Sequence, residues 1–156
     1  MTQEDKGIMA MTTFSAVARK QKDGFLVKAQ SRSFTIHLDE PREFGGQDRG
    51  ISPGELLLTA LGGCMCMVLT ALSRQHRIVI RDLWIEVEGD MDLLGYLNGT
   101  GKPRSGFQKI GYCIHVDTPA SPESFRQFHD AVKHRCPVGD TLLNGTSVVL
   151  TDIVQA

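Results

Sequence analysis

The segment Ser52–Leu72, SPGELLLTALGGCMCMVLTAL, decides the fold of this chain. Its first residues form a helix-start signal, because Ser52 can cap a helix, Pro53 suits its first turn and Glu55 stands three residues after the cap. After Glu55 the rest of the segment carries no charged side chain. A helix that is apolar on every side must be buried on every side. The sequence therefore predicts a buried central helix from Pro53 to about Gln75.

Length and composition describe an ordinary globular chain. It has 156 residues, of which 41% are hydrophobic and 22% charged, and its formal net charge is −1. The absence of a basic surplus argues against nucleic acid and against a membrane surface as partners. The first residues, MTQEDKGIMAMTT, contain acids and no apolar run, so they do not resemble a signal peptide. Four cysteines without a secretion signal indicate reduced thiols, and we expect a cytoplasmic protein.

The central segment is also close to the length that spans a bilayer. Gly62 and Gly63 interrupt it, and neither an aromatic belt nor a polybasic flank accompanies it. The remaining chain supplies strands that can bury it. We therefore expect a core helix and no membrane span.

The rest of the chain predicts strands and two further helices around this segment. Strands are expected at 11–20, 24–30, 33–38, 78–90 (as one or two strands), 107–118 and 146–154, and helices at 122–135 and 137–143. Because helices and strands do not alternate regularly, the predicted fold class is α+β. We expect one domain over residues 1–156, with 1–11 as a flexible N-terminus.

Cys136 is the thiol with the clearest local signal. It directly precedes Pro137 and so occupies the cap position of a helix. The free N–H groups and the positive end of the helix dipole favour a thiolate at that position, with His134 and Arg135 adjacent. The alternative is a small buried side chain at a helix junction.

The other candidates are weaker by pattern alone. Cys64 lies on the central helix, where a free cysteine usually only packs. Glu55 is an acid nine residues earlier, about 13 Å along one helix, so it cannot touch Cys64 directly, and capping alone would explain it. Cys66 points about 200° away from Cys64 and is interpreted as packing. Cys113 falls on the more polar face of its strand, where it is structural or a secondary oxidation site.

A metal centre is not expected from these spacings. His129, His134 and Cys136 are the best ligand candidates, but they do not share a helix face, and no Cys-x-x-Cys pair exists. The glycine-rich loops do not match a phosphate-binding loop either. The sequence therefore predicts neither a metal nor a bound cofactor.

Three motifs together resemble a known family. They are SPGELLL at 52–58, ALGGC at 60–64 and HRCPV at 134–138, preceded by a loop with DEP and FGG at 39–46. Over residues 12–154 this pattern resembles the OsmC/Ohr family of thiol-dependent hydroperoxide reductases. The resemblance implies an intertwined homodimer, in which curved antiparallel sheets surround the buried helix and the active sites lie at the interface.

The resemblance also implies roles for single residues. Cys64 corresponds to the peroxidatic thiol and Cys136 to the resolving thiol, and Glu55 lies at or next to the family's acid position. In classical members the acid directly follows the proline, whereas Gly54 stands there in this chain. Arg42 is the first candidate for the family's activating arginine, and Arg19 and Arg49 are the next candidates.

The expected function is the reduction of organic hydroperoxides in oxidative-stress defence. The resemblance implies a Cys64 sulfenic acid, a Cys64–Cys136 disulfide and an external dithiol or lipoyl-type reductant. Two alternatives stay open at this point. The same fold can bind a small apolar or thiol-bearing molecule without turnover, or it can act as a thiol-based redox sensor.

Overall fold

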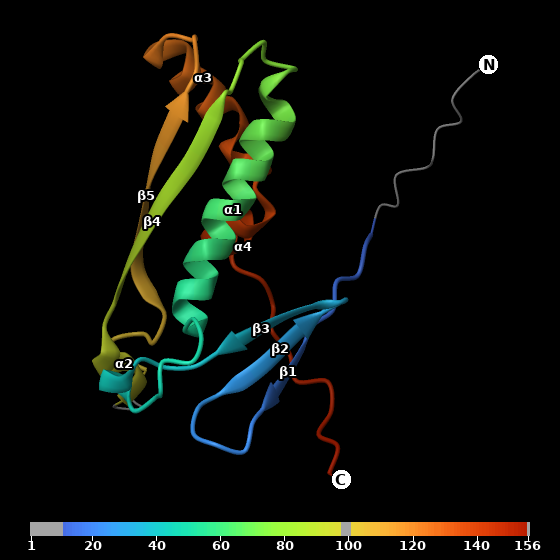
Figure 1. Ribbon diagram of the computed structural model, residues 1–156, viewed down its shortest axis with the longest axis vertical. Helices are drawn as coiled ribbons and strands as arrows, with labels where there is room; N and C mark the ends of the chain where they lie inside the picture. Colours follow the sequence, from blue (N-terminus) through green and yellow to red (C-terminus); the bar gives the residue numbers. More distant parts are fainter. Residues whose placement is uncertain (1–10, 98–100, 156) are drawn as a thin grey trace, which may run out of the picture. The chain divides into compact units, whose positions relative to one another are not determined.

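The computed structural model describes residues 11–97 and 101–155 (Figure 1). The flexible N-terminus expected at 1–11 therefore lies outside the described residues, apart from Met11. The chain divides into two compact units, residues 1–55 and residues 56–156. The single domain expected from the sequence stays a prediction.

The first unit contains a three-stranded antiparallel meander. Its strands β1 (Val17–Lys20), β2 (Val27–Ser31) and β3 (Phe34–Leu38) lie in chain order. The three predicted strands are confirmed, but the first begins at Val17 rather than at residue 11. Residues 11–16 pair with no strand of the described chain, and a strand needs a paired neighbour to satisfy its backbone groups.

The loop after β3 is organised by one buried carboxylate. Asp39 is 2% exposed and accepts hydrogen bonds from the backbone N–H groups of Glu40, Gln47 and Arg49 at 3.0, 3.3 and 3.2 Å. Burial alone raises the pKa of Asp39, but these hydrogen bonds outweigh it and lower the pKa below its ordinary value. A Cβ on Gly46 would overlap the Glu40 carbonyl, so only glycine allows this close approach. The loop includes the short 3₁₀ helix η1 (Arg42–Phe44).

The central helix α1 (Pro53–Ser73) continues from the first unit into the second. The second unit then adds an antiparallel hairpin and several shorter helices (Figure 1). In chain order these are β4 (Asp82–Met91), α2 (Leu93–Leu97), β5 (Phe107–Asp117), α3 (Pro122–Val132), the 3₁₀ helix η2 (Lys133–Arg135) and α4 (Pro137–Asn144). The predicted strands at 78–90 and 107–118 and the helix at 137–143 are therefore confirmed within a few residues.

The predicted helix at 122–135 is two elements. The α-helix ends at Val132 and a 3₁₀ turn follows, because Cys136 before Pro137 is extended, with φ −81° and ψ 109°. Proline excludes the α conformation from the residue that precedes it.

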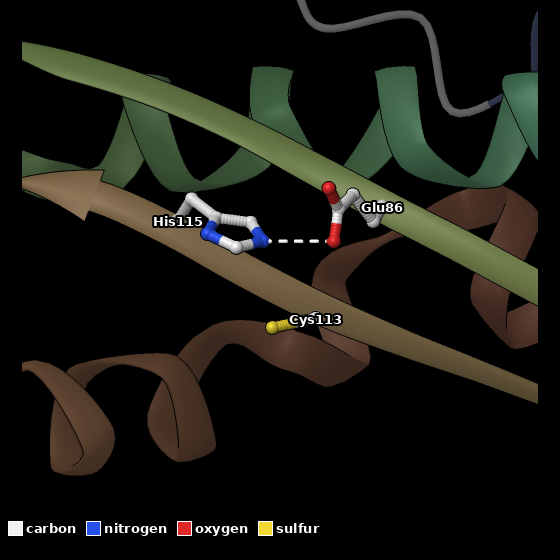
Figure 2. A group of neighbouring side chains, drawn as sticks. All are labelled: Glu86, Cys113 and His115. Atoms are coloured by element: carbon white, nitrogen blue, oxygen red, sulfur yellow. Dashed lines mark hydrogen bonds and ion pairs between the residues drawn. The ribbon is translucent and has the colours of Figure 1, made fainter.

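The hairpin β4–β5 has two different faces. Leu83, Ile85 and Ile114 pack toward the core. The residues that alternate with these along each strand point their side chains to the opposite face of the hairpin. Figure 2 shows three of these, Glu86 from β4 with Cys113 and His115 from β5.

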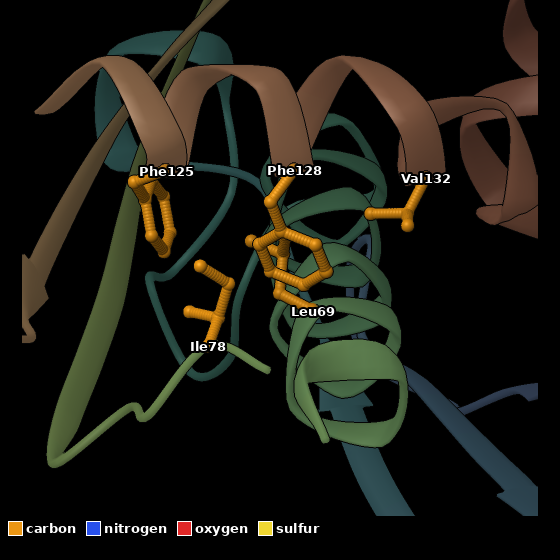
Figure 3. Packing of buried hydrophobic residues seen from close by; sticks show 5 residues of the cluster. All are labelled: Leu69, Ile78, Phe125, Phe128 and Val132. Atoms are coloured by element: carbon orange, nitrogen blue, oxygen red, sulfur yellow. The ribbon is translucent and has the colours of Figure 1, made fainter. Parts of the chain in front are cut away.

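The hydrophobic core of the second unit lies between α1, α3 and this hairpin. Phe125, Phe128 and Val132 project from one face of α3 toward Leu69 of α1 and Ile78 (Figure 3). A smaller cluster joins Leu61, Met65 and Cys136. The i, i+3, i+7 spacing of the α3 residues gives the apolar stripe expected of a helix packed on one side.

The expectation that α1 is buried on every side is wrong for the single chain. Its buried residues are Leu61, Gly62, Met65, Leu69 and Ser73, which cover only part of its circumference. Met67, on another face, is 74% exposed. Among the described residues, the elements of the second unit that pack on α1 cover one side of it, and Met67 lies outside that side.

By length and composition alone, α1 would also be able to cross a membrane. The core helix of a soluble protein meets the same two criteria. Leu61, Met65 and Leu69 of α1 belong to the core clusters of the second unit, which is the packing of a core helix.

The strand predicted at 146–154 is also absent. Residues 146–155 have neither helix nor strand, and Val148 and Leu150 are 92% and 77% exposed. The alternation of this segment is suited to a strand, but the described chain provides no sheet edge with which it pairs.

Candidate functional site

Two cysteines 72 residues apart in sequence meet in the second unit. The Sγ atoms of Cys64 and Cys136 lie 2.9 Å apart, and both are free thiols. Helix α1 carries Cys64 on the side of its buried face, where Cys64 packs against the cluster of Leu61, Met65 and Cys136. Cys136 is the N-cap residue of α4, with Pro137 as the first helical residue. The sequence therefore identified both thiols, and the tertiary structure brings them into contact.

Cys136 has well-defined hydrogen bonds. Its sulfur accepts the backbone N–H of Gly139 at 3.3 Å, and its thiol donates to the sulfur of Cys64. Burial raises the pKa of Cys136, and the hydrogen bond to Cys64 raises it further. These effects oppose the thiolate expected at Cys136, which stays a prediction. The helix N-terminus does supply its N–H group, but desolvation outweighs that contribution.

The two thiols differ in their access to solvent. Cys136 is 2% exposed, whereas Cys64 is half-buried. A molecule arriving from solvent therefore reaches Cys64 before Cys136. No pattern in the sequence indicated this difference in exposure between the two thiols.

A small apolar pocket adjoins the buried thiol. Its lining residues belong to α1, α3 and η2, together with Cys136. They are Met65, Val68, Leu69, His129, Val132, Lys133 and Cys136. Its cavity volume is about 10 Å³, which is about the space of one water molecule. Its wall is mainly hydrocarbon, which suits an apolar group better than a charged one.

His129 is a polar residue of this pocket. From the sequence it was interpreted only as a candidate metal ligand. Its Nε2 lies 3.0 Å from the Tyr112 hydroxyl and its Nδ1 lies 3.5 Å from a carboxylate oxygen of Asp130. Burial lowers the pKa of His129, against the opposing effect of Asp130. The amphipathic spacing of α3 was a signal that His129 borders the buried face.

Glu55 forms the predicted capping box at the start of α1. Its carboxylate accepts the Ser52 hydroxyl at 2.7 Å and the Ser52 backbone N–H at 2.9 Å. In return the Glu55 backbone N–H donates to the Ser52 hydroxyl at 3.3 Å. The hydrogen bonds from the Ser52 side chain and backbone lower the pKa of Glu55. The capping interpretation is confirmed, and a catalytic role for Glu55 stays a prediction.

The basic candidates all belong to the first unit, as Glu55 does, whereas both thiols belong to the second. Arg42 is exposed in η1 and Arg19 is exposed on β1. Arg49 is held within its loop, since its side chain contacts the Asp39 carboxylate at 3.5 Å and the Asp23 carbonyl at 3.2 Å. The selection of Arg42 as the activating residue stays a prediction.

The metal ligands weighed from the sequence do not gather within the described parts of the chain. The group that does gather there is Glu86, Cys113 and His115, whose ligating atoms all lie within 4.8 Å of one another. No periodicity along a single element connects these three residues. Only the pairing of two strands brings them together.

Comparisons with known proteins agree on one family. The model of the OsmC family, described as OsmC-like protein, matches residues 45–151. A protein of Mycoplasma genitalium named hydroperoxide reductase is 27% identical over 126 residues, covering 80% of this chain and 83% of that protein.

Solved structures show the same fold. An OsmC-like protein from Mycoplasma pneumoniae superposes with a TM-score of 0.73 at 24% identity, covering 85% of this chain and 88% of that one. An organic hydroperoxide resistance protein OsmC from Legionella pneumophila gives a TM-score of 0.61 at 20% identity, covering 86% and 91%. The α+β fold expected from the sequence is therefore of the OsmC type, and the family match spans more than half of the chain. The chain belongs to the OsmC-like protein family.

Proposed function

We propose that this protein is a thiol peroxidase that reduces organic hydroperoxides. The observation that carries the proposal is the 2.9 Å separation of the Cys64 and Cys136 sulfur atoms, because a disulfide between them needs only a small movement. The name of the Mycoplasma genitalium relative, hydroperoxide reductase, supports the same reaction class.

The reaction consumes one hydroperoxide and two thiol groups. The Cys64 thiolate attacks the terminal peroxide oxygen, the O–O bond breaks, and the alkoxide takes a proton and leaves as an alcohol. Cys64 is then a sulfenic acid. The Cys136 sulfur attacks the Cys64 sulfur, its proton and the hydroxyl group leave together as water, and a disulfide forms.

An external dithiol completes the cycle. Thiol–disulfide exchange transfers the two oxidising equivalents to this reductant and restores both cysteines. We propose a dithiol or lipoyl-type molecule for this step, with no bound cofactor. The buried position of Cys136 makes the mixed disulfide form first at Cys64, the half-buried thiol.

Three features of the site support the assignment of roles. Cys64 is the accessible thiol and Cys136 the buried one. Burial also raises the pKa of Cys136, which favours its role as hydrogen-bond donor to Cys64 before a sulfenic acid forms. The side chains next to Cys136 are mainly hydrocarbon, a surrounding that suits an organic hydroperoxide better than free hydrogen peroxide.

The proposed reaction also needs a cation and an acid near Cys64. We propose that Arg42 holds Cys64 as a thiolate and that Glu55 orients this cation, in a cytoplasmic homodimer without nucleic-acid or membrane partners. An arginine suits this role because its guanidinium stays charged and forms paired hydrogen bonds.

Single-turnover oxidation tests the proposal directly. Reduced protein receives one equivalent of cumene hydroperoxide, and peptide mapping by mass spectrometry identifies the products. We expect a Cys64–Cys136 disulfide in the wild type and a Cys64 sulfenic acid in Cys136→Ser. Turnover with a dithiol should fall to the uncatalysed rate in Cys64→Ser and stay unchanged in the control Cys66→Ala.

Persistence of turnover in Cys64→Ser would exclude the proposed nucleophile. If both thiols stay free under excess peroxide, the pocket is better explained as a binding site for a small apolar molecule. Rapid disulfide formation without dithiol-driven turnover would instead indicate a redox sensor.

A further inference from the structure

The outer face of the β4–β5 hairpin brings together three different metal-ligating side chains. The strand register places Glu86 directly opposite Cys113, and His115 lies one pleat further along β5, opposite Trp84. One His115 ring nitrogen, Nε2, is 3.0 Å from a Glu86 carboxylate oxygen, and all three ligating atoms fall within 4.8 Å (Figure 2).

The orientation of His115 is restrained by its neighbours. The Trp84 indole stacks on the imidazole with ring centroids 4.7 Å apart and an interplanar angle of 2°. The Glu86 hydrogen bond holds the ring from its edge. A ligand that is already oriented loses less conformational entropy on binding a metal.

The face that carries these groups is polar and open in the described structure. Glu86 and Cys113 are exposed, and Glu88 lies on the same face one pleat further along β4. Two carboxylates on this face attract a cation. The opposite face packs on the core, so the cluster is independent of the Cys64–Cys136 pair.

We propose that Glu86, Cys113 and His115 form a binding site for a divalent cation of the zinc class. Thiolate, imidazole and carboxylate are the three ligand types of Zn²⁺ in proteins, and a soft thiolate disfavours Mg²⁺ and Ca²⁺. Binding forms one bond from the metal to each residue and releases the Cys113 thiol proton to solvent. No electron is transferred, and water completes the coordination.

The geometry requires only a local adjustment. Ligand atoms in a tetrahedral zinc site lie about 3.6 Å apart, given bonds of about 2.0–2.3 Å. The three atoms here already lie within 4.8 Å, so rotations of two exposed side chains are sufficient. The Glu86–His115 hydrogen bond is then replaced by two bonds to the metal, and the proton that Nε2 donates in that hydrogen bond moves to Nδ1 of the imidazole.

This proposal departs from the expectation that the chain has no metal site. The sequence places Cys113 and His115 on one strand face, but two ligands are too few for a zinc site. Glu86 joins them only through the register between strands separated by α2 and its flanking loops. A shift of one residue in that register would turn Glu86 to the opposite face.

Titration with Co²⁺ and Zn²⁺ tests the site on the full reduced chain. Trp84 is the chain's one tryptophan and stacks on His115, so bound Co²⁺ should quench the intrinsic fluorescence with a stoichiometry of one per chain. We also expect a thiolate-to-cobalt charge-transfer band, and Zn²⁺ should displace Co²⁺ and abolish that band. Mg²⁺ should have no effect.

Matched variants assign the ligands. Cys113→Ala should remove the charge-transfer band, while His115→Gln and Glu86→Gln should weaken binding roughly tenfold or more, since even indirect partners of metal ligands contribute that much. Glu88→Gln removes the same charge from the same face and should retain most of the Co²⁺ affinity, because Glu88 attracts the cation but does not bind it. Circular dichroism and peroxide turnover of each variant establish that the fold is retained.

Two results would overturn the proposal. One is the absence of a thiolate band in the wild type. The other is a band that persists in Cys113→Ala but disappears in Cys64→Ser or Cys136→Ser, because the metal would then lie at the other thiol pair.

Discussion

At the scale of single residues, the two thiols of the candidate site have different surroundings. Cys136 is almost fully buried, and burial raises its pKa, with the hydrogen bond to Cys64 adding to the effect. Its neighbour Cys64 is half-buried and accepts that hydrogen bond. Two cysteines in contact thus have different environments, which is the arrangement that a division between attacking and resolving thiols requires.

The raised pKa of Cys136 makes stability depend on pH. The folded state holds the thiol proton more tightly than the unfolded state does, so this stabilisation is complete below the ordinary thiol pKa of about 8.5 and is lost as the pH rises toward the folded-state pKa. We expect the urea midpoint of the reduced protein to fall between about pH 7.5 and pH 9.5, on either side of that ordinary value.

Cys136→Ser should show a smaller fall over the same range, because it lacks the titrating thiol. Cys113→Ser removes an exposed thiol instead and should behave as the wild type does, with a chelator present in all samples. Equal slopes for Cys136→Ser and the wild type would contradict the assignment.

At the scale of elements, helix α3 forms one wall of the core and of the pocket. Its buried residues Phe125, Phe128 and Val132 are positioned by a well-defined start, where the Ser121 hydroxyl accepts the Ser124 backbone N–H at 3.2 Å. Pro122 follows as the first helical residue. The cap and the apolar stripe therefore act together to place Val132 beside Cys136 in the pocket lining.

Removal of this cap should destabilise the protein measurably. Ser121→Ala leaves an N–H group at the helix start without its acceptor and should cost about 1 kcal/mol of unfolding free energy. For a chain of this size the melting temperature should then fall by about 2–4 °C. Differential scanning calorimetry measures the change.

Ser121→Asn is the matched control, since asparagine caps as well as serine does. Its melting temperature should stay near that of the wild type. A loss as large as that of Ser121→Ala would show that the cap is not the cause.

At the scale of the whole molecule, a single chain leaves too much apolar surface without a neighbour. Met67 on α1 is 74% exposed, and Val148, Leu150 and Ile153 of the C-terminal segment are 92%, 77% and 72% exposed. Large apolar side chains that are exposed in this way are suited to an interface with another chain. A second copy of the chain is the partner that we propose for it.

The proposed homodimer makes a prediction about α1. A carboxylate introduced by Met67→Glu would be buried without a partner in the interface, so it should convert the dimer to a monomer at micromolar concentration. Light scattering coupled to size-exclusion chromatography measures the mass.

Arg126→Glu, a charge change at an exposed position of α3, is the control and should leave the dimer intact. A wild-type protein that elutes as a monomer, or a Met67→Glu variant that stays dimeric, would contradict the prediction.

Features with a local cause could be predicted from the sequence. The capping box of Ser52 and Glu55, the helix start at Pro122 and the cap position of Cys136 each depend on a few adjacent residues, and the structure contains all three. The alternating strands of the hairpin and the α+β class follow for the same reason. The motifs around Cys64 and Cys136 also identified the family, because residue types and their spacing can be read directly from the sequence.

What only the tertiary structure decided depends on residues far apart in sequence. The contact of Cys64 with Cys136 spans 72 residues, and burial, which no local pattern measures, raises the pKa of Cys136 where its helix position alone would lower it. The register of β4 against β5 assembled Glu86, Cys113 and His115. Residues 146–154 have the alternation of a strand, yet a strand exists only where an edge accepts its hydrogen bonds. A sequence encodes the local preference for helix, strand or turn directly. Burial and strand pairing, in contrast, depend on contacts between distant segments, which exist only in the folded chain.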